Sequence, residues 1–258
     1  MKRIMLTVAY DGTNYHGWQT EPTGLSVEEV LNKALSKRLG EDIRVKGVSR
    51  TDSGVHARGN LCVFDSETPI PPEKVCFAVN EVLPEDIVVR KSEEVPADFH
   101  PRKCDSLKTY EYTLYHDSLP DPLVRHYTTF FYRKLDVPKM REAAAFLVGE
   151  HDFSSFCSAG AQVETKIRRI TALSIEEEGT RVAFRITGTG FLYNMVRIIA
   201  GTLLRVGTGF WPPEKVKEIL EAKDRQAAGP KAPAEGLCLM EIRLFPEGFP
   251  EEITRSWN

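Results

Sequence analysis

The feature that most constrains the fold is an order of predicted elements that occurs twice along the chain. The first half is predicted to run β-α-β-β-α-β, with strands at 3–10, 43–48, 61–65 and 86–95 and helices at 26–40 and 72–82. The second half repeats that order with insertions, through strands at 109–115, 167–175, 181–187 and 238–245 and helices at 138–148, 191–206 and 213–222. This order is typical of the ferredoxin-like, split βαβ motif. No residue-level repeat accompanies it, so the duplication depends on element order alone.

Local signals support individual elements. The stretch Arg3–Tyr10 has an apolar residue at every second position, which is the period of a strand with one buried face. Ser26 and Glu29 have the spacing of a capping box, and Gly40 is typical of the residue that ends a helix. These signals favour a strand followed by an amphipathic helix at the start of the chain.

Two halves of this kind predict an α+β fold with two domains. We expect an N-terminal domain at 1–105 and a C-terminal domain at 106–258. A length of 258 residues with 41% hydrophobic composition is enough to build a core in each. Two split βαβ sheets can join into one long, mixed, mainly antiparallel sheet with helices on one face and a central cleft.

Composition limits the class of protein. The longest apolar run, Met195 to Val206, is interrupted by arginines, so neither a membrane span nor an export signal is predicted. Five cysteines are scattered without a C-x-x-C pair, which fits reduced thiols in the cytoplasm better than a disulfide framework. A net charge of -3 lacks a basic excess, so binding to nucleic acid would depend on local basic clusters.

The segment from Gly47 to Gly59 holds the densest set of reactive and conformationally special residues. It reads GVSRTDSGVHARG, so Asp52 is its only carboxylate and lies between Arg50 and Arg58. Its glycines permit a tight turn that presents one acid in a cationic frame. Judged on these residues alone, an ordinary Asx-turn with solvated arginines is the simpler interpretation, because Asp-Ser-Gly is common turn chemistry.

Other chemistries leave no clear signal. The six histidines lack the spacing of a zinc site, and no P-loop, dinucleotide fingerprint or G-x-S-x-G motif is present. We therefore expect neither a metal nor a cofactor. The chemistry would then fall to side chains, with Asp52 as the best candidate.

Residues Arg50 to Ala57 resemble the signature of the tRNA pseudouridine synthase A (TruA) family, whose catalytic aspartate corresponds to Asp52. The similarity is not confined to this motif, since it extends from the first predicted strand almost to the last. Further stretches that resemble family motifs, in the same order, are 10–19, 98–102, 108–112, 191–197 and 229–237.

The resemblance implies a cytoplasmic enzyme that converts uridine to pseudouridine at positions 38 to 40 of tRNA, in the anticodon stem-loop, with RNA bound over the central cleft. The reaction cuts the C1'–N1 glycosidic bond, turns the base and rejoins it through C5. Nothing is oxidised or reduced, so no cofactor is needed. Family members are homodimers, and one tRNA contacts both subunits.

The resemblance also assigns roles to single residues. It makes Arg197 the partner that keeps the catalytic carboxylate ionised. It makes Tyr110 the aromatic residue that packs against the target base, and Leu237 an apolar wall that excludes water. Arg58 is favoured for holding the flipped nucleotide. Contacts with RNA are expected from Arg50, Arg58, Arg102, Arg168, Asp11 and Gln19.

Plainer interpretations stay open. Without the resemblance, Arg197 reads as one polar residue on an apolar helix, Tyr110 as a strand aromatic and Leu237 as core. Tyr110 and Tyr112 lie on the same face of a strand, so either or both could be core. For the whole protein, one alternative is a non-catalytic RNA-binding protein, which the intact catalytic set disfavours. The other is a nucleoside glycosidase, which usually needs a second carboxylate that the 47–59 segment lacks.

Overall fold

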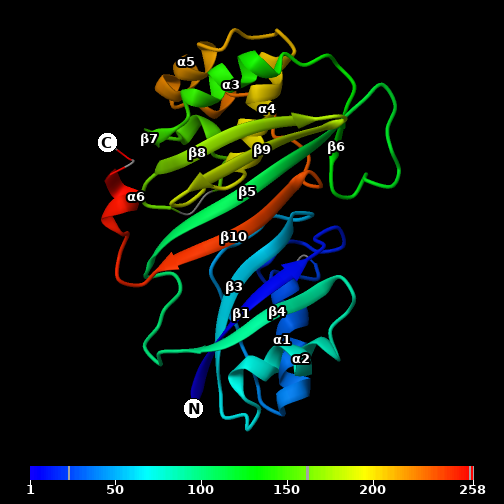
Figure 1. The fold of residues 1–258 in the computed structure, drawn as a ribbon, viewed down its shortest axis with the longest axis vertical. Helices are drawn as coiled ribbons and strands as arrows, with labels where there is room; N and C mark the ends of the chain where they lie inside the picture. The colour runs from blue at the N-terminus through cyan, green and yellow to red at the C-terminus, as the bar shows by residue number, and fades with distance from the viewer. Residues whose placement is uncertain (23, 161–162, 256, 258) are drawn as a thin grey trace. The chain divides into compact units, whose positions relative to one another are not determined.

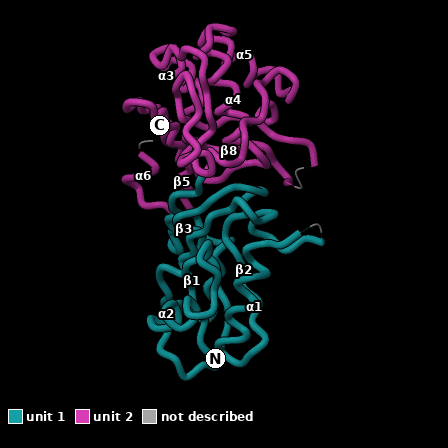
Figure 2. The backbone as a smooth tube through the Cα atoms, turned by 90° about the vertical axis from the view of Figure 1, so that its right-hand side faces the viewer, with its two compact units in different colours: residues 1–105, 238–248 teal, residues 106–237, 249–258 magenta. Residues whose placement is uncertain are grey.

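The computed structural model describes residues 1–22, 24–160, 163–255 and 257 of the chain. Backbone contacts divide it into two compact units, which Figure 2 draws in teal and magenta. Unit 1 comprises residues 1–105 and 238–248, and unit 2 comprises residues 106–237 and 249–258. Each unit combines strands with helices (Figure 1), which confirms the predicted α+β class.

Unit 1 has the predicted split βαβ arrangement. Strand β1 lies between β3 and β4 and is antiparallel to both, while β2 is antiparallel to β3 and β10 runs parallel to it. The pairing is therefore mixed and mainly antiparallel. The residues at alternate positions of β1, from Ile4 to Tyr10, are buried, as the period-two pattern predicted. The elements are β1 (Lys2–Tyr10), α1 (Val27–Leu39), β2 (Lys46–Gly47), β3 (His56–Ser66), η1 (Pro72–Lys74), α2 (Val75–Asn80), β4 (Ile87–Val95) and β10 (Leu237–Phe245).

Unit 2 is built on a second antiparallel series of strands. Strands β5, β9, β8 and β7 are neighbours in that order, and β6 pairs in parallel with β5. Helix α3 packs against both α4 and β8. The elements are β5 (Asp105–His116), β6 (Thr129–Phe131), α3 (Val137–Ala145), β7 (Gly149–Asp152), η2 (Ser154–Phe156), β8 (Ile167–Glu178), β9 (Arg181–Gly188), α4 (Met195–Gly207), α5 (Lys215–Ala222), η3 (Arg225–Ala227) and α6 (Glu251–Arg255).

Several element boundaries differ from the sequence prediction. The strand predicted at 43–48 is reduced to β2, which has two residues. Strand β3 begins at His56 rather than Leu61, because its first residues pair with β1 and β10, which are distant in sequence. The helix predicted from Phe191 begins only at Met195, because Asn194 at its N-cap has a left-handed backbone with φ of 60°. The short elements β6, β7 and α6 were not predicted.

The predicted domain limits, 1–105 and 106–258, stay a prediction. In the structure, residues 238–248 group with the first unit, because Cys238 and Leu239 pair with the start of β3. No helix within the described ranges is long and apolar enough to cross a membrane. The five cysteines are free thiols, and burial raises the pKa of Cys62.

Candidate functional site

Asp52 lies in the acid loop, which we define as residues 48–55 between β2 and β3. Its side chain is half-buried, whereas Arg50 and Arg58 on either side of it are exposed. Gly54 has φ of 77°, a conformation that glycine adopts without steric cost. Val55 N donates a hydrogen bond to Asp52 O at 3.1 Å. The turn predicted from Asp-Ser-Gly is therefore present, and it carries a half-buried aspartate.

The loop that follows β1, called here the first loop (residues 11–22), packs on the acid loop. Trp18 N donates to Thr51 O at 3.1 Å, and Gly54 N donates to Tyr15 O at 3.1 Å. A Cβ atom on Gly17 would lie 2.4 Å from Thr51 O, so only glycine permits this approach. These contacts fix the backbone on both sides of Asp52.

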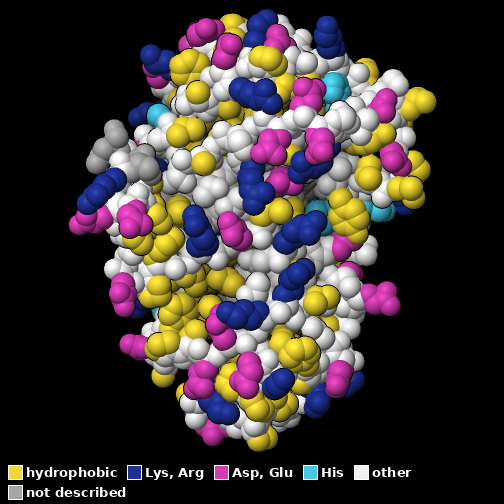
Figure 3. All heavy atoms as spheres, viewed as in Figure 1, with side chains coloured by type: hydrophobic (Ala, Val, Ile, Leu, Met, Phe, Trp, Pro, Cys, Tyr) yellow, Lys and Arg dark blue, Asp and Glu magenta, His cyan; other side chains and the backbone are white. Residues whose placement is uncertain are grey.

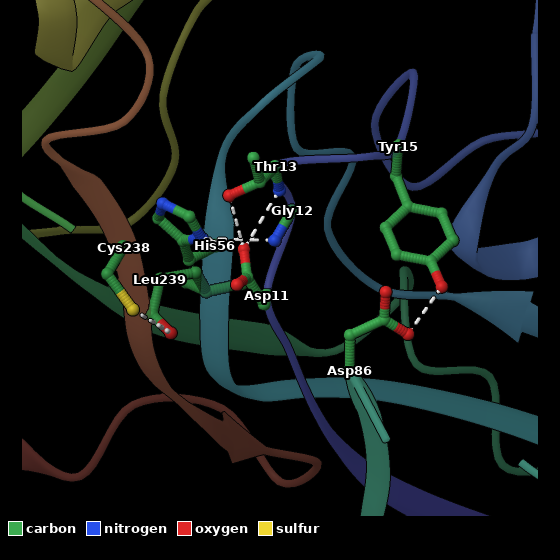
Figure 4. Close-up of polar contacts among 8 residues, drawn as sticks. All are labelled: Asp11, Gly12, Thr13, Tyr15, His56, Asp86, Cys238 and Leu239. Carbon is green, nitrogen blue, oxygen red and sulfur yellow. Dashed lines mark hydrogen bonds and ion pairs between the residues drawn. The ribbon is translucent and has the colours of Figure 1, made fainter. Parts of the chain in front are cut away.

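Asp11 was predicted to contact RNA, and the structure shows it bonded within unit 1 (Figure 4). Its Oδ1 accepts hydrogen bonds from Thr13 N at 2.9 Å and Thr13 Oγ1 at 2.6 Å, and lies 3.2 Å from His56 Nδ1. In the same view Tyr15 donates its hydroxyl hydrogen to Asp86 Oδ1 at 2.6 Å. Burial, and then this hydrogen bond, raise the pKa of Tyr15. The first loop is therefore anchored through its own polar side chains.

Three of the arginines predicted to bind RNA belong to unit 1. Arg50, Arg58 and Arg102 are all exposed. Arg102 also has a structural bond, because its Nε donates to Gly47 O at 2.7 Å, next to the acid loop. Gln19, from the same predicted set, is half-buried in the first loop. Their contacts with RNA stay a prediction.

Tyr110 lies on β5 of unit 2 and is 6% exposed. Its ring makes an edge-to-face contact with Phe191, with centroids 5.2 Å apart. Tyr112 is fully buried and donates its hydroxyl hydrogen to Pro233 O at 3.1 Å, and burial raises its pKa. Tyr112 is therefore core, which answers one of the open alternatives, while the role of Tyr110 stays a prediction.

Arg197 lies in the first turn of α4 and is 8% exposed. Its Nε donates to Ala232 O at 2.7 Å, and its Nη1 donates to Asn194 Oδ1 at 3.0 Å. Ala232 N donates in return to Arg197 O at 3.1 Å. The guanidinium therefore does not extend into solvent from an apolar helix. It joins α4 to the late loop, residues 229–236.

Glycines allow the late loop to lie directly against α4. A Cβ atom on Gly201 would be 1.8 Å from Pro230 O, and one on Gly229 would be 2.7 Å from Thr202 Cα. Gly229 N donates to Thr202 Oγ1 at 2.9 Å. Leu237, immediately after this loop, is 5% exposed, and its role as an apolar wall stays a prediction.

Arg168, the fourth arginine predicted to bind RNA, is half-buried on β8. Its Nη1 donates to Thr165 O at 2.9 Å and to Ile167 O at 2.6 Å. Burial lowers the pKa of its guanidinium. Its side chain is thus held against its own strand, and its contact with RNA stays a prediction.

The two candidate charges suit different chemical tasks. A half-buried carboxylate such as that of Asp52 can act as a nucleophile or base, and a buried guanidinium such as that of Arg197 can stabilise negative charge. No cluster of three or more potential metal ligands occurs among the described residues. Sequence reasoning missed the supporting roles of Tyr10, whose hydroxyl oxygen lies 2.7 Å from Thr51 Oγ1, and of His56, which accepts a hydrogen bond from Gly12 N, although both residues lie within the quoted motifs.

Comparison with known proteins gives one consistent result. Residues 6–102 and 143–244 match a family described as tRNA pseudouridine synthase. A protein of Clostridium acetobutylicum, named tRNA pseudouridine synthase A, is 48% identical over 94% of this chain and 99% of its own length. Proteins of the same name from Acetivibrio thermocellus and Brevibacillus brevis are 44% and 46% identical with the same coverage.

Proposed function

Because this chain belongs to the tRNA pseudouridine synthase family, we propose that it isomerises uridine at positions 38 to 40 of tRNA, in the anticodon stem-loop. Asp52 is the single catalytic carboxylate in this proposal, and no cofactor takes part. The observation that carries it is the acid loop, where tethered backbone on both sides presents a half-buried carboxylate between two exposed arginines. Exposed arginines suit the phosphates that flank a target nucleotide.

The reaction can be balanced with one carboxylate. The C1'–N1 bond breaks, the base turns, and a C1'–C5 bond forms. The proton lost from C5 is matched by the proton that N1 gains, so no electrons are transferred. An ionised Asp52 can attack C1', attack C6 or remove a sugar proton, and each of these steps requires the charged form.

Residues of unit 2 take further roles in this proposal. Tyr110 packs against the target base, Arg197 stabilises negative charge in the reaction, and Leu237 forms an apolar wall. These roles rest on the motif matches at 108–112, 191–197 and 229–237 and on the burial of all three side chains. The proposed contacts with RNA are Arg50, Arg58, Arg102, Arg168, Asp11 and Gln19.

We further propose a cytoplasmic homodimer. The segment between β5 and β6 exposes Leu119 (73%), Leu123 (87%) and Tyr127 (55%), and Figure 3 shows hydrophobic side chains along this part of unit 2. Clustered apolar exposure of this kind marks interaction sites. The same segment carries Asp121 and Arg125, and a surface with both charges can complement a second copy of itself.

Sedimentation should show a dimer for the parent and a monomer for Leu123→Glu, and a monomeric parent would contradict the proposal.

The catalytic assignment is tested by Asp52→Asn, which keeps size and turn geometry but cannot act as a nucleophile or strong base. Turnover, measured as tritium released from tRNA labelled at uridine C5, should fall by at least about 10²- to 10⁴-fold. Affinity for tRNA and the melting temperature should stay near those of the parent. Turnover within about threefold of the parent would contradict the assignment, because a lost general base costs far more.

Two controls sharpen this experiment. Transcripts that carry uridine at only one of positions 38, 39 and 40 test the proposed sites, and release only from uridines elsewhere would refute them. Turnover after extensive dialysis against a chelator should be unchanged if no cofactor takes part. A parent enzyme that binds tRNA but releases no tritium would favour the non-catalytic alternative.

A further inference from the structure

His56 is the first residue of β3 and lies four positions after Asp52. Its side chain is 5% exposed, and a buried imidazole needs hydrogen-bond partners. Gly12 N donates to its Nδ1 at 3.0 Å, and Asp11 Oδ1 lies 3.2 Å from the same nitrogen (Figure 4). His56 thus connects the end of the acid loop to the first loop.

Counting hydrogen bonds assigns the proton of this imidazole to Nε2. Asp11 Oδ1 has two lone pairs and already accepts from Thr13 N and Thr13 Oγ1. His56 Nδ1 has one lone pair, and Gly12 N–H is directed at it. A proton on Nδ1 would remove this acceptor from a buried N–H, which is destabilising. Nδ1 is therefore the acceptor.

The contact with Gly12 fixes the point at which the acid loop ends. A Cβ atom on Gly12 would lie 2.0 Å from Val55 O, so the two backbones touch one residue before His56. The other side of Asp52 is fixed at Thr51, whose Oγ1 lies 2.7 Å from the Tyr10 hydroxyl oxygen. Asp52 therefore lies between two tethers, and both lead to the same region at the end of β1.

We propose that His56 is a positioning residue for Asp52, which acts by accepting the Gly12 N–H at Nδ1 and so holding the end of the acid loop. The inference rests on the proposed catalytic role of Asp52. Position matters to the rate, because a displacement of about 1 Å in a reacting group can cost about 10²-fold. His56 takes no part in the bond-making steps and needs no contact with the substrate.

A pair of substitutions separates the position of the acceptor from the size of the side chain. In His56→Asn the amide oxygen reaches the place of Nδ1, whereas in His56→Gln it reaches the place of Nε2. The Asn variant should keep kcat within about threefold of the parent. The Gln variant should lose about 10- to 100-fold in kcat, with KM changed by less than about threefold. The Gln variant should melt at a lower temperature than the Asn variant, because the buried Gly12 N–H loses its acceptor, and both should stay folded at the assay temperature.

Three outcomes would overturn the positioning role. They are equal kcat in the Asn and Gln variants, a loss of kcat in the Gln variant that disappears when the rate is corrected for the fraction of folded enzyme, and an effect on KM alone. The ¹⁵N spectrum of the parent's imidazole checks the proton position without any substitution, and a protonated Nδ1 in the neutral ring would also overturn it. Asp52→Asn is assayed alongside. Full activity of Asp52→Asn refutes the proposed function, whereas full activity of His56→Gln with an inactive Asp52→Asn refutes only the positioning role.

Discussion

The two units differ in the hydrogen bonds that surround their candidate charges. In unit 1 the neighbours of Asp52 carry the structural bonds, through Thr51 O to Trp18 N and through Gly54 N to Tyr15 O. In unit 2 Arg197 is itself a structural part, since its guanidinium binds Ala232 O and Asn194 Oδ1. Because Asp52→Asn keeps the size and turn geometry of the side chain, it should separate activity from stability, whereas a change at Arg197 should affect both.

The largest effect expected within this comparison is that of Arg197→Met. Turnover should fall by at least about 10²-fold, as for a lost electrostatic contact at a reacting centre. The free energy of unfolding should fall by about 1–3 kcal/mol, because Ala232 O and Asn194 Oδ1 lose a charged donor. Tritium release and thermal unfolding measure the two effects.

Arg197→Lys is the matched control. It keeps the positive charge, but a single ammonium lacks the planar fork that binds both oxygens. The lysine variant should therefore be less stable than the parent and more stable than the methionine variant. If turnover of Arg197→Met is unchanged, Arg197 takes no part in the proposed reaction. If turnover is lost while the melting temperature is unchanged, Arg197 has no structural role, and the contrast drawn between Asp52 and Arg197 is wrong.

A smaller effect is expected from Gly17→Ala in the first loop. Gly17 has φ of 86°, and an added Cβ would lie 2.4 Å from Thr51 O. The clash should displace the acid loop, lower kcat about tenfold or more, and destabilise unit 1 by about 1–3 kcal/mol.

Gly40→Ala serves as its control. Gly40 ends α1 with φ of 73°, but a Cβ there would meet nothing within 4 Å. It should cost about 1–2 kcal/mol for the left-handed backbone and leave kcat unchanged. Equal kcat in the two alanine variants would mean that the acid loop tolerates displacement, which contradicts the role assigned to its tethers.

Local chemistry was enough to predict the parts of the fold whose partners are close in sequence. Helix α1 runs between the predicted caps, because Ser26 Oγ accepts from Glu29 N and Gly40 adopts a left-handed backbone. The turn at Gly54 likewise follows from the Asp-Ser-Gly sequence. In each case the stabilising partner lies within a few residues, so a short window of sequence contains the whole cause.

The rest depends on partners that a short window cannot show. Arg197 binds a carbonyl that lies 35 positions later, and no periodicity on α4 predicts that contact. Position 201 has no room for a side chain because Pro230 O lies against it. That constraint is visible only once the late loop is placed on the helix. The start of β3 depends in the same way on pairing with β10. These features are properties of tertiary packing rather than of local propensity.

The smallest effect concerns Asp65, a carboxylate on β3 that contrasts with Asp52 on the loop before the same strand. Arg3 binds both of its oxygens, with Nε to Oδ1 at 2.7 Å and Nη2 to Oδ2 at 2.8 Å. The two residues face each other across β1 and β3. The hydrogen bond from Arg3 lowers the pKa of Asp65. Its charge therefore contributes to structure, whereas that of Asp52 is proposed to act in chemistry.

Asp65→Asn should leave tritium release unchanged and lower stability at neutral pH by about 1 kcal/mol or less, as expected for a partly exposed ion pair. The sign of its pH dependence follows from the lowered pKa of Asp65 in the folded state. The stabilisation is fully present above the unfolded value of about 3.9 and is lost as pH falls through the folded pKa. The parent should therefore lose melting temperature faster than the variant below about pH 4, so that the two curves converge. Curves that stay parallel would show that the Arg3 pair does not contribute to acid stability, and a loss of turnover would show that the contrast between the two carboxylates is wrong.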